Sequence, residues 1–173
     1  MVSITARPAE VEDGKVPGRW EGDLVMGTRP SAVATLVERT SRHTAIVALP
    51  DGIRAEQVTS RTRSLLGIPP QLRRTLTWDR GREIAEHQAI TTETRMPIYH
   101  CKPRSPWQRG TNENTNRLLR QYLPKGADLR TFSQADLDAI AHELNHRPRK
   151  THGYRTPTEI YADLLNSGDA LTA

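Results

Sequence analysis

The first part of the chain alternates short apolar runs with brief polar breaks, which is typical of successive β-strands. Residues 20–27 form one such run and carry a single carboxylate, Asp23, in their middle. Residues 32–38 and 44–49 are rich in Val, Ile and Thr, and only a short polar segment separates them. Three strands with short connections predict an antiparallel meander.

Beyond Pro50 the apolar positions are more widely spaced, and the pattern changes from strands alone to alternating helices and strands. It predicts, in order, a helix that ends at Gly67, a strand at 72–78, a helix at 83–94, a strand at 98–101 and a loop at 102–110. Further helices are predicted at 111–123, with Thr111 as N-cap, at 133–145, with Ser133 as N-cap, and at 157–165. The helix at 133–145 has its apolar face at Leu137, Ile140, Ala141 and Leu144.

This order of elements is typical of the ribonuclease-H-like α/β fold, in which helices flank a mixed five-stranded sheet. We expect one domain of this kind at residues 19–165. It would be preceded by an extended N-terminal arm at 1–18, which contains several Pro and Gly residues, and followed by a short C-terminal tail at 166–173.

The chain of 173 residues has a formal net charge of +5 and a pI of about 9.8, which favours a polyanionic partner such as nucleic acid. Many soluble proteins that do not bind nucleic acid are equally basic, so charge alone does not establish a nucleic acid partner. The single cysteine, Cys101, excludes an intramolecular disulfide. With no signal peptide and no apolar run long enough to cross a bilayer, we expect a soluble, cytoplasmic protein without a membrane partner.

Three acidic residues have positions that suggest chemistry. Asp23 lies inside an apolar strand, where a charge is costly unless it is paired or bound to metal. Asp79 ends the predicted fourth strand, and Glu113 lies in the first turn of the helix after Gly110. In a ribonuclease-H-like sheet the first and fourth strands are neighbours and this helix packs beside them, so the three carboxylates could converge.

Converging carboxylates are suited to hard divalent cations such as Mg²⁺, which prefer oxygen ligands. Two ions about 4 Å apart can activate a nucleophile and stabilise the leaving oxygen of a phosphoryl displacement. Asp23 would bridge the two ions, and Asp79 and Glu113 would each complete one shell. The alternative is that an acidic residue is a solvated surface group, which is the better interpretation for most of the 20 acids and the weakest for Asp23.

Several blocks of sequence resemble the integrase core of transposases of the insertion-sequence thirty family. The blocks are WEGDL at 20–24, LVERT at 36–40, TLTWD at 75–79, SPWQRGTNEN at 105–114, LNHRPRK at 144–150 and YRTPTE at 154–159. Asp79 and Glu113 are 113 − 79 = 34 positions apart, as the family requires of its second Asp and its Glu. The likeness covers roughly residues 7 to 165.

The resemblance implies a ribonuclease-H-like fold with an Asp-Asp-Glu triad at Asp23, Asp79 and Glu113, which holds two Mg²⁺ or Mn²⁺ ions. The implied activity is DNA transposition: water hydrolyses an element end to expose a 3′-hydroxyl, which then attacks target DNA without a covalent protein–DNA intermediate. Transposon ends, target DNA and further copies of the chain are the implied partners.

The sequence departs from the family in three ways. Arg117 stands where glycine is common, and Lys102 where an acid is common. Family members also carry a helix-turn-helix region ahead of the core, to which nothing here corresponds. A truncated, non-catalytic DNA-binding remnant is therefore the alternative to an active enzyme.

Basic residues surround the predicted triad and suggest contacts with DNA phosphates. Arg117 and Arg120 follow Glu113 by four and seven positions, on the same helical face. The other candidates are Arg109 and Lys125 near this helix, and the cluster Arg147, Arg149 and Lys150. The alternative for each of them is a solvated basic surface.

A second motif predicts different chemistry. Residues 142–146, His-Glu-Leu-Asn-His, match the zinc-protease signature, in which His142 and His146 bind zinc and Glu143 is the general base. Such a site needs a third protein ligand, for which His152 and Glu159 are candidates. Because the pattern is short and occurs by chance, a zinc protease is a remote alternative.

Overall fold

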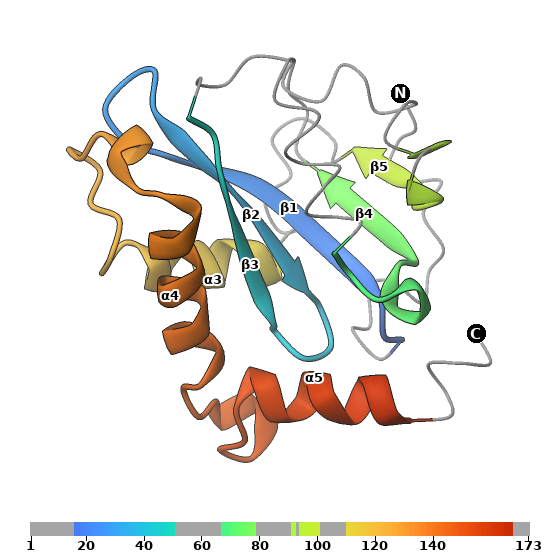
Figure 1. The fold of residues 1–173 in the computed structure, drawn as a ribbon. Helices are drawn as coiled ribbons and strands as arrows, with labels where there is room; N and C mark the ends of the chain where they lie inside the picture. Colours follow the sequence, from blue (N-terminus) through green and yellow to red (C-terminus); the bar gives the residue numbers. More distant parts are fainter. Residues whose placement is uncertain (1–15, 51–66, 79–90, 93, 101–109, 168–173) are drawn as a thin grey trace.

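The computed structural model describes residues 16–50, 67–78, 91–92, 94–100 and 110–167 of the chain. Its centre is a five-stranded sheet in the order β3-β2-β1-β4-β5, against which the helices pack (Figure 1). The strands are β1 (Arg19–Met26), β2 (Ala32–Glu38), β3 (Thr44–Ala48), β4 (Thr75–Trp78) and β5 (Ile98–His100). Strand β1 therefore lies in the middle of the sheet.

The sheet is mixed, as predicted. Strands β1, β2 and β3 form the antiparallel meander, in which Asp23 is the Cα partner of Thr35. Strand β4 is parallel to β1, and β5 is parallel to β4. Parallel neighbours need long crossover connections, whereas the meander is closed by short turns, and the order of segments along the sequence satisfies both requirements.

The fourth strand is shorter than predicted. The sequence pattern suggested residues 72–78, but β4 begins at Thr75 because Leu72 belongs to a 3-10 turn, η4 (Pro70–Leu72). Pro70 favours this turn through its fixed φ angle, and the Leu72 amide donates to the Pro69 carbonyl at 2.9 Å.

Some predicted segments lie outside the described residues. These are the helix before Gly67, most of the helix at 83–94, the strand end at Cys101, the loop up to Arg109, most of the N-terminal arm and most of the C-terminal tail. Thr91, Thr92 and Thr94 are helical, in agreement with the predicted helix at 83–94.

Three α-helices are described in full: α3 (Gly110–Leu119), α4 (Gln134–Asn145) and α5 (Pro157–Asn166). The predicted cap of α4 is confirmed, because Ser133 and Asp136 form a reciprocal capping box. The predicted cap of α3 is wrong: Thr111 is buried within the helix, and its carbonyl accepts from the Thr115 hydroxyl at 3.1 Å.

The core has one apolar cluster on each face of the sheet. The first contains Trp20, Leu36, Leu72, Leu76 and Trp78, and the α5 residues Tyr161, Leu164 and Leu165 pack against it. The second joins Val25, Val33 and Ile46 to Leu119, Leu129, Leu137 and Leu144 under α3 and α4. Because side chains alternate along a strand, Asp23 shares its face of β1 with Val25, under α3 and α4.

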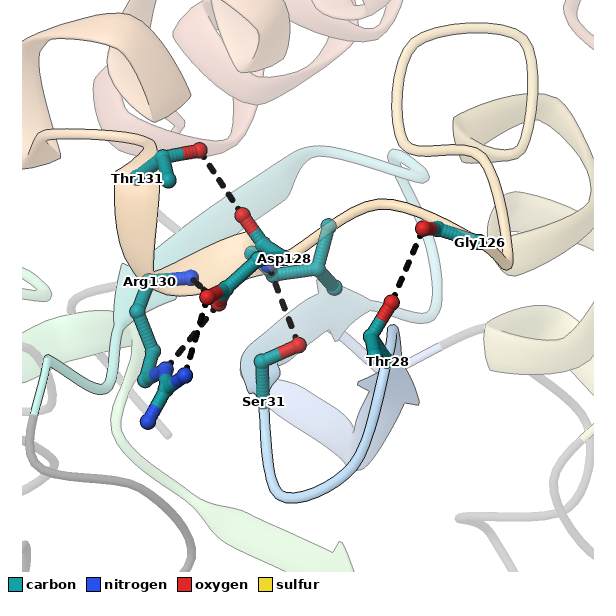
Figure 2. A network of polar contacts seen from close by, with 7 residues as sticks. Thr28, Ser31, Gly126, Asp128, Arg130 and Thr131 are labelled. Atoms are coloured by element: carbon teal, nitrogen blue, oxygen red, sulfur yellow. Dashed lines mark hydrogen bonds and ion pairs between the residues drawn. The ribbon is translucent and has the colours of Figure 1, made fainter.

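The turn between β1 and β2 is tied to the segment that follows α3 (Figure 2). The Thr28 hydroxyl donates to the Gly126 carbonyl at 2.8 Å, and the Leu129 amide donates to the Ser31 hydroxyl at 3.0 Å. A Cβ at Gly27 would overlap the Ala127 carbonyl oxygen, so this close approach requires glycine. These contacts hold the segment after α3 against the β1–β2 turn.

Gly22 allows an equally close approach at the centre of the sheet. It is the Cα partner of Trp78 in β4, and a Cβ built on Gly22 would overlap the Trp78 ring. The Trp78 side chain is only 2% exposed, so it has no space into which to move. The missing side chain of Gly22 therefore makes room for the Trp78 ring directly before Asp23.

We predict that Gly22→Ala lowers the free energy of unfolding by about 1–3 kcal/mol or more, because a methyl group is forced against a packed ring. Urea unfolding followed by circular dichroism measures this. Gly126→Ala is the matched control, since a Cβ there would have no neighbour within 4 Å. Equal stability of the two variants would contradict the close packing described.

Helix α5 is held to the β2–β3 hairpin by an aromatic stack. The His43 ring lies 4.0 Å from the Tyr161 ring, centroid to centroid, and nearly parallel to it, and Trp20 meets Tyr161 edge-on at 6.3 Å. Burial, and then the nearby His146, lower the pKa of His43 from 6.5 to about 4. His43 is therefore neutral in the folded protein at physiological pH.

This pKa predicts a loss of stability in acid. Between pH 6.5 and about 4 the unfolded chain binds a proton at His43 that the folded chain excludes, so the free energy of unfolding falls as pH decreases. The loss from this group is at most about 3 kcal/mol. Urea titrations across this range should show a smaller acid loss for His43→Phe, which keeps an aromatic ring without a titrating group. An equal loss in both proteins would refute the assignment.

Candidate functional site

Asp23 lies near the middle of β1 with its half-buried side chain on the face covered by α3. Its Oδ1 atom accepts from the Leu24 amide at 2.8 Å. Its Oδ2 atom accepts from the Asn116 side-chain amide of α3 at 3.1 Å. The carboxylate is thus hydrogen-bonded to both its own strand and the helix above it, which offsets the cost of placing a charge there.

Asn116 is oriented by a second contact. Its Oδ1 atom accepts from the Thr35 hydroxyl of β2 at 3.3 Å, which directs the NH₂ group towards Asp23. The Thr35 hydroxyl also lies 3.4 Å from the Asp23 carbonyl oxygen. Thr35, Asn116 and Asp23 thereby join β2, α3 and β1 in one polar unit.

Glu113 lies in the first turn of α3, as predicted, and its side chain is exposed. It precedes Asn116 by three positions, so the two residues are neighbours on the helix surface. The structure therefore brings the helix that carries Glu113 onto the strand that carries Asp23, and the contact between them is one helical turn from Glu113.

The third predicted carboxylate, Asp79, lies outside the described residues. It follows Trp78 in the sequence, and Trp78 is the parallel partner of Gly22, the residue that precedes Asp23. Among the residues described, no group of three His, Cys, Asp or Glu side chains is arranged to hold a metal ion. The described part of the predicted triad consists of Asp23 and Glu113.

The basic residues on and after α3 differ in their surroundings. Arg117 and Lys125 are exposed, whereas Arg109 lies outside the described residues. Arg120 is half-buried, and its Nη1 atom donates to the carbonyls of Met26 at 2.7 Å and Leu123 at 3.3 Å. Through this nitrogen Arg120 joins the helix end to β1, and its contact with phosphate stays a prediction.

The residues of the predicted basic cluster after α4 also differ in their contacts and exposure. Arg147 donates to the Tyr122 hydroxyl and to the Gln121 side chain at 3.1 Å, and its guanidinium lies 3.8 Å from Glu143. These contacts give Arg147 a structural role between α3 and α4. Arg149 is half-buried and Lys150 is exposed.

The predicted zinc-protease motif does not form a metal site. The rings of His142 and His146 are 3.9 Å apart, but Glu143 accepts from the Tyr122 hydroxyl at 2.8 Å. The candidate third ligands have other partners: His152 Nε2 lies 3.0 Å from the Ser41 carbonyl oxygen, and Glu159 caps α5. Throughout the described ranges no three-ligand group includes these residues.

The sequence interpretation missed Asn116 and Thr35, which orient Asp23. The available signal for Asn116 was its position, three residues after Glu113 on a predicted helix. Thr35 sits opposite Asp23 in the meander, but its role depends on a helix 81 residues away in the sequence. No helix of the described residues is long and apolar enough to span a bilayer.

Sequence comparison finds relatives among the transposases of insertion sequences. The chain is 52% identical over 166 residues to the transposase for insertion sequence element IS1086 of Cupriavidus metallidurans, an alignment that covers 95% of this chain and 49% of the relative. It is 48% identical over 171 residues to transposase InsI for insertion sequence element IS30A of Escherichia coli K12, covering 98% of this chain and 43% of the relative. The chain thus spans about half the length of the curated relatives that it matches.

The catalytic core domain of BIV integrase superposes with a TM-score of 0.64 at 20% identity, over 86% of this chain and 96% of that one. This likeness confirms the predicted ribonuclease-H-like fold. Residues 13–106 match the integrase core domain family, and they include β1 to β5 and both Asp23 and Asp79. The chain belongs to the integrase core domain family.

Proposed function

We propose that the chain is the catalytic core of a DNA transposase, which cuts and joins DNA strands by metal-dependent phosphoryl transfer. The observation that carries the proposal is the hydrogen bond from Asn116 to Asp23, since it joins the central strand to the helix that bears Glu113. Membership of the integrase core family supports the reaction class, and the names of the relatives support the substrate.

Asp79 is the third carboxylate of the proposed site. Gly22 and Trp78 are paired in parallel strands, and the next residues in the sequence are Asp23 and Asp79. Parallel strands advance at nearly the same rise per residue, so continuation of this register would bring the two aspartates side by side.

The donor chemistry suits Mg²⁺ or Mn²⁺. Asp23, Asp79 and Glu113 offer carboxylate oxygens, which hard divalent cations prefer. Ions bound there would activate the attacking hydroxyl and stabilise the charge on the leaving oxygen. The sequence resemblance implies two ions, and the proposed triad provides ligands for both.

The protein itself contributes orientation and charge. Asn116 and the Leu24 amide hold the two oxygens of Asp23 in a fixed direction. Glu113 is exposed, so it can meet a ligand that approaches over α3. Arg117 lies one turn beyond Glu113 and is also exposed, which places a cation where a DNA phosphate next to the site would need one.

We predict that Asp23→Asn and Glu113→Gln each reduce strand joining by roughly a thousandfold or more, because a metal-binding carboxylate is lost. The assay is the joining of pre-cut DNA ends to target DNA with Mg²⁺ or Mn²⁺. Asp138→Asn, an exposed acid on α4, is the control and should keep full activity. DNA binding without joining by the unmodified chain would favour a non-catalytic DNA-binding domain, and joining by Asp23→Asn would disprove the proposed catalytic site.

We predict further that Asn116→Asp destabilises the protein at neutral pH by roughly 1–3 kcal/mol, since it sets a second carboxylate beside Asp23. The repulsion raises the carboxyl pKa in the folded state, so stability is present in acid and is lost as pH rises above about 4. Urea unfolding of the variant and of the unmodified chain, at neutral pH and below about pH 4, tests this. Asn114→Asp, exposed on the same helix, should show no such loss; a similar loss in both variants would contradict the Asn116–Asp23 contact.

A further inference from the structure

An open pocket of about 250 Å³ lies beside α3, away from the contact between Asn116 and Asp23. Three parts of the chain line it: the helix α3, the turn between β2 and β3, and the segment that follows α4. The lining residues are Arg42, Asn114, Thr115, Leu118, Arg149, Lys150 and Thr151. Three of these carry positive charge and none is acidic.

None of the three cations forms an ion pair within the described residues. Burial lowers the pKa of Arg42 and outweighs the carboxylates of Glu21 and Glu38, which attract Arg42 from outside the pocket. Arg149 donates from Nη2 to the Leu144 carbonyl at 3.2 Å, but its Nε atom is buried without a hydrogen-bond partner. Burial, and then the positive charges of Arg147 and Arg42, lower the pKa of Arg149. Buried donors and neighbouring like charges both cost free energy, and an anion in the pocket would relieve both.

The walls of the pocket are fixed by hydrogen bonds. Arg42 has a φ of +64°, and the Arg42 amide donates to the Glu38 carbonyl at 2.8 Å. The turn is held from the other side by Asn145 of α4, which bonds to the amide and the carbonyl of Thr44, each at 2.9 Å. His152, at 3.0 Å from the Ser41 carbonyl, connects the same turn to the segment that carries Lys150. The backbone segments that carry Arg42 and Lys150 are therefore held in place before a ligand arrives, which lowers the cost of ordering them.

The position of the pocket relative to Glu113 and Asp23 indicates which anion would reach it. Asn116 faces Asp23 on one side of the helix, and Asn114 and Leu118 face the pocket on the other. The exposed Glu113 and Arg117 lie between these two sides. A nucleic acid strand that reaches Glu113 from the side of Asp23 and crosses this exposed surface would meet the pocket about one helix diameter, ~10 Å, further on.

We propose that this pocket binds a backbone phosphate of DNA through Arg42, Arg149 and Lys150. The inference rests on the proposed function, which supplies DNA as the partner. The inference adds a DNA contact on the side of α3 opposite Asp23. It also adds Arg42, from the β2–β3 turn, to the residues that would bind DNA. The contact is electrostatic and carries no base specificity.

The test is the salt dependence of DNA binding, measured by fluorescence anisotropy with a labelled duplex in EDTA so that no strand is cut. Any sequence is suitable, because phosphate contacts are independent of sequence. Loss of one contact should reduce the slope of log K against log salt by about 1 and raise Kd about tenfold at low salt. We expect both changes for Arg42→Gln and for Lys150→Gln.

Arg130→Gln is the matched control, because it also removes one positive charge from the chain. Arg130 is exposed and forms an ion pair with Asp128 at 2.9 Å, so its loss should leave the slope unchanged. Lys150 is exposed as well, so Lys150→Gln should fold normally. It therefore tests phosphate binding in the pocket even if Arg42→Gln fails to fold. Lys150→Arg keeps the charge and should retain the slope of the unmodified chain.

The outcomes separate the pocket from the proposed function. Equal salt-dependence slopes for Lys150→Gln and Arg130→Gln would disprove phosphate binding in the pocket, even if strand joining is found to depend on Asp23. A reduced slope in a chain that cannot join DNA would support the pocket and overturn the catalytic proposal. Absence of DNA binding by the unmodified chain would overturn both.

Discussion

The structure depends on one constraint: a charged side chain in the central strand must be hydrogen-bonded where a helix covers it. Asp23 meets this requirement through Asn116, whose amide is in turn directed by Thr35. The same contact that satisfies the Asp23 carboxylate therefore docks α3, and docking α3 sets the place of Glu113. This polar unit therefore links the geometry of the site to the packing of α3, which the apolar contacts of Leu119 with the sheet also hold.

The apolar core makes this unit rigid. Side chains of β1 alternate between two clusters, so the strand that carries Asp23 is packed on both faces. Gly22 lets Trp78 lie against β1, which holds β4 next to the residues before Asp23. Arg120 joins the C-terminal end of α3 to β1, and Ser31 holds the later segment at Leu129 to the β1–β2 turn.

Local pattern was enough to predict most of the fold. The meander was visible in its Val-, Ile- and Thr-rich runs, and the Ser133 cap and the position of Glu113 followed from helix signals. The start of β4 was mispredicted because the turn at Pro70 overrides the apolar pattern at Leu72. Such differences arise where a local conformational preference competes with burial.

Side-chain partners were the part that sequence could not predict. Arg120 and Arg147 have the spacing of a DNA-binding surface, yet their guanidinium groups bind Met26 and Tyr122, which are close only in the folded chain. Asn116 was missed for the same reason, since its partner is 93 positions away. Periodicity reports which face of a helix is exposed, but it does not report which distant carbonyl or carboxylate lies opposite.

We propose that carboxylates distant in sequence act together on one metal site. The most direct measurement is a double-mutant cycle on Mn²⁺ binding, with Asp23→Asn and Asp79→Asn alone and combined, followed by electron paramagnetic resonance without DNA. A shared site predicts that each substitution weakens Mn²⁺ binding and that their effects are strongly non-additive. Strictly additive effects, or unchanged Mn²⁺ binding by Asp79→Asn, would contradict the account.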